Sequence, residues 1–71
     1  MAITLDEAKA TIRMSLDIAS GDADMVARSL DKAQRDARQY FGYTADEDDH
    51  YAMLRLALSD LTGNASYRDE R

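Results

Sequence analysis

The chain contains no proline, and its three glycines stand at the evenly spaced positions 21, 42 and 63. Proline breaks a helix internally, whereas glycine adopts the left-handed backbone conformation in which many helices end. Between the glycines, apolar residues recur with helical spacing and not with the strict alternation of a strand. The sequence therefore predicts an all-α fold of three helices separated by these glycines. The predicted helices cover residues 5–20, 23–41 and 45–62.

Each predicted helix is preceded by a residue that can cap its amino end. Thr4 with Glu7, and Thr44 with Glu47, have the threonine-to-glutamate spacing of a capping box. Asp22 can accept a hydrogen bond from the first turn of the second helix. The caps therefore predict where the three helices begin, and the glycines predict where they end.

One apolar face of each helix is expected to form the core. The expected core residues are Leu5, Ala8, Ile12, Ser15, Leu16 and Ala19 in the first helix, Val26, Leu30, Ala33, Ala37, Tyr40 and Phe41 in the second, and Tyr51, Leu54, Ala57, Leu58 and Leu61 in the third. The aromatic residues at the corner 40–43 are expected to form a hydrophobic plug. Because only two residues separate Gly42 from the third helix, we expect a tight hairpin and a small antiparallel three-helix bundle. An extended helical hairpin that dimerises is the alternative.

The chain of 71 residues is long enough for one domain, expected over residues 1–63, with a polar tail at 64–71. We expect this tail to be frayed, with Tyr67 turned back onto the bundle. A domain of this size buries only about 60% of its unfolded surface, so small domains often gain stability from a disulfide, a metal or a second subunit. With no cysteine and one histidine, a homodimer is the plausible addition.

The formal net charge is −5, which disfavours nucleic acid as the main partner because phosphate contacts need a basic surface. The acidic start Asp6-Glu7 does not resemble a signal peptide, and no apolar run reaches the length of a membrane span. A cytoplasmic protein with no membrane association is therefore expected. Asp outnumbers Glu and Arg outnumbers Lys, a bias that suggests a GC-rich phage or bacterial genome.

The acidic run 46–49 and the neighbouring His50 are the only concentration of potential metal ligands. An EF-hand loop beginning at Asp46 would need glycine and glutamate where Tyr51 and Ala57 stand. Carboxylates in the first turn stabilise the positive end of a helix dipole, which explains the run without a metal. Since the serines lack a nucleophile elbow or a nearby base, we expect no cofactor, no small-molecule substrate and no enzymatic activity.

The predicted first and third helices carry more apolar residues than a three-helix core requires. The surplus residues are Met14, Ile18, Met53 and Leu56. Methionine-containing faces suit adaptable protein contacts. We therefore expect a small acidic, non-enzymatic interaction protein, working as a regulator, inhibitor or adaptor through this face. Its partner would be another protein, a second copy of the chain, or both.

The second predicted helix carries a basic face, which supports an alternative function. A helix-turn-helix-like DNA-binding protein could use Arg28, Lys32, Arg35 and Arg38. Asp22 and Asp24, at the start of the same helix, would oppose the approach of DNA. A further alternative is an acidic mimic of nucleic acid, although the concentration of acids at one helix end disfavours an extended mimic.

Overall fold

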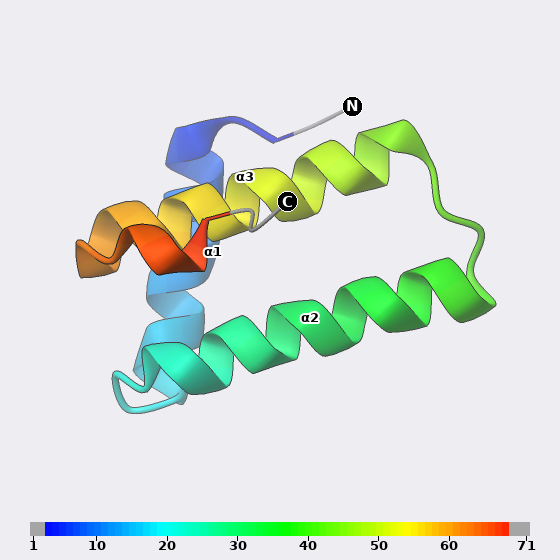
Figure 1. Ribbon diagram of the computed structural model, residues 1–71. Helices are drawn as coiled ribbons and strands as arrows, with labels where there is room; N and C mark the ends of the chain where they lie inside the picture. Colours follow the sequence, from blue (N-terminus) through cyan, green and yellow to red (C-terminus); the bar gives the residue numbers. More distant parts are fainter. Residues whose placement is uncertain (1–2, 69–71) are drawn as a thin grey trace.

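Three α-helices and one short 3₁₀-helix make up the described part of the chain, residues 3–68, in the computed structural model (Figure 1). They are α1 (Leu5–Ile18), α2 (Ala23–Tyr40), α3 (Ala45–Thr62) and η1 (Ala65–Tyr67). The predicted all-α fold with three helices is confirmed. The predicted domain and tail extend to residues 1–2 and 69–71, which lie outside the described range.

The three helices begin at the predicted caps. Thr4 Oγ1 accepts from the backbone N–H of Glu7 at 3.2 Å, and the Glu7 carboxylate accepts from the backbone N–H of Thr4 at 3.1 Å. Thr44 Oγ1 accepts from the N–H of Glu47 in the same way, and Asp22 caps α2. These bonds satisfy backbone donors that have no partner within the helix.

The carboxyl end of α1 differs from the prediction by two residues. Ser20 already has a positive φ of 56°, so the helix ends at Ile18 and the turn occupies both Ser20 and Gly21. The N–H of Gly21 donates to the carbonyl of Leu16 at 2.7 Å and closes this turn. α3, by contrast, ends at the predicted Thr62, followed by Gly63 in the left-handed conformation.

α3 is the central element, because α1, α2 and η1 all pack against it while α1 and α2 contact each other less. Figure 1 shows α2 and α3 running in opposite directions on either side of the loop 41–44. α1 crosses behind α3 at a steep angle in this view. The antiparallel arrangement predicted for all three helices is therefore not confirmed, and dimerisation stays a prediction.

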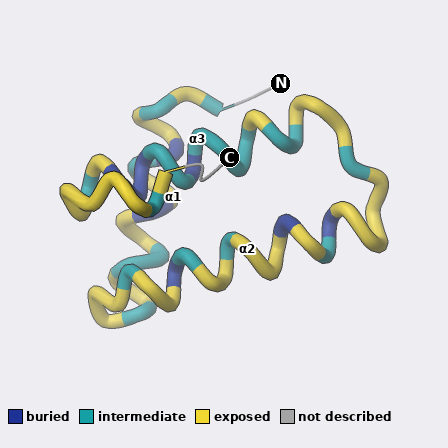
Figure 2. The backbone as a smooth tube through the Cα atoms, in the orientation of Figure 1, coloured by how far each residue is buried: buried dark blue, intermediate teal, exposed yellow. Residues whose placement is uncertain are grey.

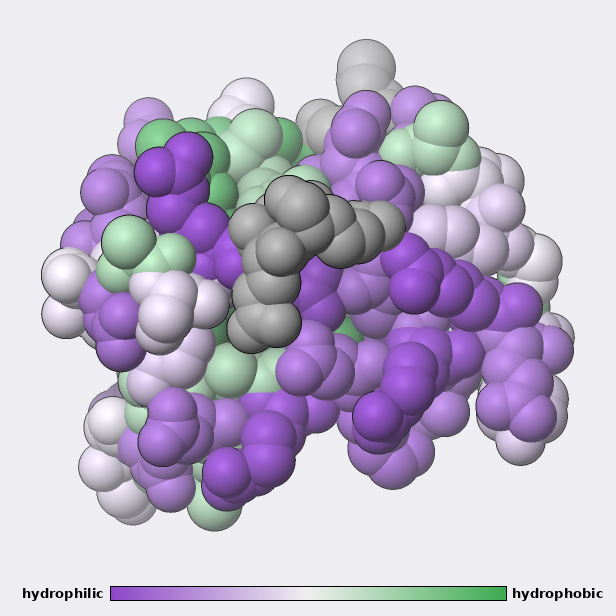
Figure 3. All heavy atoms as spheres, viewed as in Figure 1, coloured by the Kyte–Doolittle hydropathy of each residue, from purple (hydrophilic) through white to green (hydrophobic). Residues whose placement is uncertain are grey.

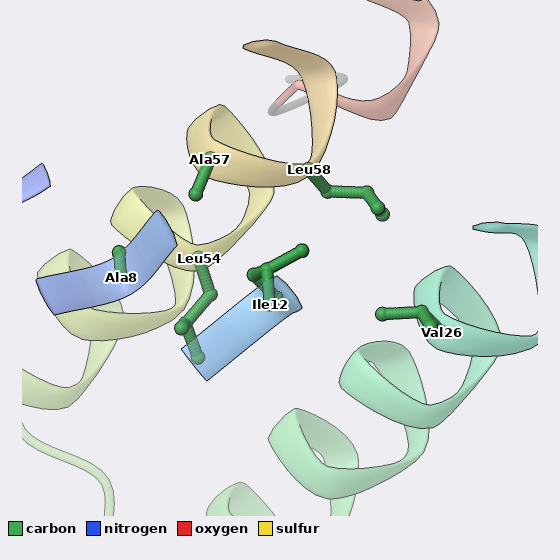
Figure 4. Close-up of a cluster of buried hydrophobic side chains, with 6 residues drawn as sticks. All are labelled: Ala8, Ile12, Val26, Leu54, Ala57 and Leu58. Carbon is green, nitrogen blue, oxygen red and sulfur yellow. The ribbon is translucent and has the colours of Figure 1, made fainter. Parts of the chain in front are cut away.

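The core is a small cluster to which every α-helix contributes (Figure 4). Its buried residues are Ala8, Ile12, Val26, Leu54, Ala57 and Leu58. Ile12 and Leu58 are the largest fully buried side chains, and Figure 4 shows Ile12 between the residues of α3 and Val26 of α2. Figure 2 shows the buried positions on the inner sides of the helices, with most of α2 exposed.

The second half of α2 packs differently from the prediction. Its buried positions are Gln34 and Ala37, whereas Ala33 is exposed. Tyr40 and Phe41, predicted to form a plug, are also exposed. The inward-facing positions of α2 therefore include Leu30 and Gln34, and not the expected Ala33. The buried side chain at this end of the hairpin is the polar amide of Gln34.

The segment after Gly63 is structured as far as residue 68, whereas the sequence predicts a frayed tail. Asn64 caps η1 through its side chain, and Tyr67 packs against the core cluster as expected. The Tyr67 hydroxyl donates a hydrogen bond to Asp24, 43 residues earlier in the chain. This bond to an acceptor carboxylate raises the pKa of Tyr67, because the bond is lost when the hydroxyl ionises.

Candidate functional site

An apolar hollow of about 280 Å³ lies between the second half of α1 and the first half of α2. Its lining residues are Ser15, Ile18, Ala19, Met25, Val26, Ser29 and Leu30. Val26 is buried, whereas Ile18 and Met25 are exposed. The turn 19–22 joins α1 to α2, and both exposed side chains line one hollow. An exposed apolar surface beside a hollow is typical of a site that contacts another molecule.

Two of the four residues predicted for partner binding are exposed. The exposed fractions are 67% for Met14 and 84% for Ile18, one helical turn apart on α1. Met53 packs against the core cluster, which corrects its assignment to a surplus outer face, and Leu56 is half-buried. The role of all four in partner binding stays a prediction.

Met25 is a surface residue that the sequence reasoning missed. It is 47% exposed and lines the same hollow as Ile18. Helical periodicity indicates which face of α2 Met25 belongs to. It does not show that Met25 and Ile18 of α1 line the same hollow. The short connection between α1 and α2 is the one sequence feature that indicates that the end of α1 lies near the start of α2.

The charges at this end of the molecule are mainly acidic. The last turn of α1 has no basic residue and contains Asp17, so its negative dipole end is not neutralised from within the helix. Asp22 and Asp24 stand at the start of α2, where they stabilise the positive end of its dipole. In the sequence, Asp17 directly precedes Ile18, and Asp24 directly precedes Met25, the two exposed residues that line the apolar hollow.

The basic face predicted on α2 is exposed, but its members have different surroundings. Lys32 pairs with Asp36 at 2.8 Å within the helix, and Arg38 lies over the ring of Tyr43 at 4.8 Å. Arg38 is also 3.5 Å from the Asp48 carboxylate on α3. Arg35 and Arg38 line a cavity at the seam between α2 and α3, whereas Arg28 does not.

Asp31 of α2 pairs with Arg55 of α3, although Arg35 follows Asp31 by four residues, a spacing that also suits an ion pair within the helix. The sequence spacing within α2 gives no information about the position of Arg55, the one arginine of α3, relative to Asp31. Lys9 of α1 pairs with Asp60 of α3 at 2.8 Å. This hydrogen bond and the charge of Lys9 lower the pKa of Asp60.

A polar network at the closed end of the hairpin was not predicted from the sequence. The Gln34 amide donates to the Tyr43 hydroxyl at 2.6 Å, and that hydroxyl donates to Asp48 Oδ1 at 2.8 Å. Gln34 is only 4% exposed, and the Tyr43 ring stacks on Tyr51 with 6.5 Å between centroids. A buried amide with partners of this kind fixes how two helices meet.

The acidic run 46–49 occupies the first turns of α3 as expected. Within residues 3–68, no group of three or more histidine or carboxylate side chains is arranged to hold a metal ion. His50 is half-buried. The centroids of the His50 and Tyr51 rings lie 5.7 Å apart, and the two rings are nearly perpendicular.

Comparison with protein-family models, with curated proteins and with solved structures finds no match to this chain. Among the described residues, no helix has both the length and the apolar character needed to cross a membrane.

Proposed function

We propose that this protein is an interaction module that binds an amphipathic helix of a protein partner in the apolar hollow between α1 and α2. The observation that supports the proposal is the exposure of Met14, Ile18 and Met25, two of which line the hollow. Proteins often recognise helices by laying apolar anchors at helical spacing into such a hydrophobic groove. The partner chemistry is therefore an apolar helix face.

The negative charge of this protein supports a partner helix that carries basic residues. The chain has a net charge of −5, and Asp17, Asp22 and Asp24 lie at the helix ends that join around the hollow. A partner helix with lysine or arginine beside its apolar face would be attracted to this end of the molecule. Such complementarity speeds encounter and selects among partners more than it adds affinity.

The proposal is tested by titrating the ¹⁵N-labelled protein with a synthetic amphipathic helix of leucine and lysine. We expect saturable shifts of the amide signals concentrated in residues 14–30. Ile18→Asp should weaken the binding about tenfold or more, since it places a charge where an apolar anchor would dock. The fold should survive this change because Ile18 is exposed.

Phe41→Asp is the matched control, because Phe41 is 76% exposed and the substitution introduces the same charge away from the hollow. Equal weakening by both variants would contradict the proposal, as would shifts scattered over the whole molecule. A leucine–glutamate helix of the same pattern should bind much more weakly. A solution mass that rises with concentration and falls in Ile18→Asp would assign the face to a second copy of the chain.

A further inference from the structure

A second cavity, of about 320 Å³, opens at the seam where α2, α3 and η1 meet. Its charged lining residues are Arg35, Arg38, Arg55, Arg68 and Asp31. Among the described residues 3–68, four arginines against one aspartate make this cavity locally basic, in a chain whose net charge is −5. Figure 3 shows strongly hydrophilic side chains gathered over the seam between α2 and α3. This concentration of positive charge runs against the charge of the whole chain.

Two of the arginines are held in place by other parts of the fold. Arg55 pairs with Asp31 across the seam, and its side chain is only 15% exposed. Arg38 is held between the Tyr43 ring and Asp48. Arginines fixed in this way lose less conformational freedom when they bind a ligand.

The other two arginines, Arg35 and Arg68, are not paired with a carboxylate of the described residues. Within residues 3–68, neither Arg35 nor Arg68 forms an ion pair shorter than 4 Å. Arg68 makes a minor contribution to the lowered pKa of Asp60, which depends chiefly on Lys9. The guanidinium groups of Arg35 and Arg68 thus bring positive charge to the cavity that no carboxylate in the described residues neutralises by direct contact.

From this arrangement we infer that the cavity between α2, α3 and η1 binds a small phosphate-bearing anion of about the size of a diphosphate. The planar guanidinium group donates two parallel hydrogen bonds to phosphate oxygens, so several arginines around one cavity suit a multiply charged phosphate. The volume lies at the lower end of the range of about 300–1,000 Å³ for ligand pockets, which favours a small ligand.

The same observations disfavour an extended nucleic acid as the occupant. Only Arg35 and Arg38 of the predicted DNA-contact residues line the cavity, and the other two lining arginines come from α3 and the segment after η1. Beyond the cavity the chain carries an excess of acids, which would repel a long polyanion. A small anion can be bound without meeting that surface.

The inference is tested by titrating the ¹⁵N-labelled protein with sodium pyrophosphate at constant ionic strength and following the arginine side-chain Nε–H signals. We expect saturable shifts of the signals of the four lining arginines, Arg35, Arg38, Arg55 and Arg68, and weaker binding of inorganic phosphate. Sodium chloride should cause no comparable change. Titration with ADP separates recognition of the diphosphate from recognition of a larger ligand: equal affinity assigns the site to the diphosphate group, and tighter binding adds contacts with the nucleoside.

Arg35→Gln combined with Arg68→Gln should weaken pyrophosphate binding about tenfold or more, because it removes the two lining arginines that form no ion pair within residues 3–68. Arg28→Gln is the matched control, since Arg28 is an exposed arginine of the same helix that does not line the cavity. Binding that does not saturate, or equal weakening in the control, would overturn the inference. Far-ultraviolet circular dichroism of each variant verifies that the fold is retained.

Discussion

Gln34 shows how a single polar residue decides the geometry of one end of the molecule. It is buried, and its amide reaches the Tyr43 hydroxyl, which in turn donates to Asp48. From the sequence, Gln34 is one more polar residue between apolar positions, and the periodicity favours Ala33 for the core. The partners of Gln34 come from the loop and from α3, so its burial could not be predicted from α2 alone.

Gln34→Ala should lower the free energy of unfolding by about 1–3 kcal/mol, because the half-buried polar groups of Tyr43 and Asp48 lose a partner. Urea denaturation followed by circular dichroism measures this change. The double variant with Tyr43→Phe should show a coupling of about 0.5–3 kcal/mol, as residues of one network are not independent. Strict additivity of the two single changes would contradict the network.

At the scale of the elements, the starts of the helices were predicted well and their ends less well. A cap depends on a short sequence pattern, so Thr4, Asp22 and Thr44 are recognisable from their sequence neighbours alone. The end of α1 depends on Ser20 adopting a positive φ, which is uncommon outside glycine and has no clear sequence signal. The surroundings of Ile18 could not be predicted for the same reason, because they depend on the turn that follows.

The capping box of α1 should make the stability of this helix dependent on pH. The hydrogen bonds from the Thr4 backbone and side chain lower the pKa of Glu7 below its ordinary value of 4.5. The ionised carboxylate therefore stabilises the fold above the ordinary pKa, and this contribution is lost as the pH falls through the lowered value. Thermal unfolding of Glu7→Gln should show a deficit relative to the original chain at pH 7. That deficit should shrink as the pH falls below 4.5 and through the lowered pKa of Glu7, whereas a deficit independent of pH would contradict a role of the charge.

At the scale of the whole molecule, the class of fold could be predicted and the crossing of the helices could not. Hydrophobic periodicity identifies which residues of α1 face inward, such as Ala8 and Ile12, but not the angle at which α1 meets α3. Met53, for example, packs against the core cluster instead of forming part of a separate outer face. The arginine cavity combines residues from α2, α3 and the segment after η1, so no single helix pattern reveals it.

Because the core is small, the stability of the whole molecule should depend strongly on its largest members. Leu58→Ala should cost about 2–5 kcal/mol, out of roughly 4–10 kcal/mol expected for a chain of this length. Leu56→Ala removes the same atoms from the same helix at a half-buried position and should cost about 1 kcal/mol. Urea unfolding of both variants measures the difference. Equal losses would contradict the central position of Leu58.

The central position of α3 also has a consequence for the order of events during synthesis. α1 and α2 leave the ribosome first, yet their main packing partner is the helix that is translated after them. Short helices without a partner are marginally stable in water. The first forty residues therefore remain without a completed core until α3 emerges, and folding becomes a late step that follows translation of the third helix.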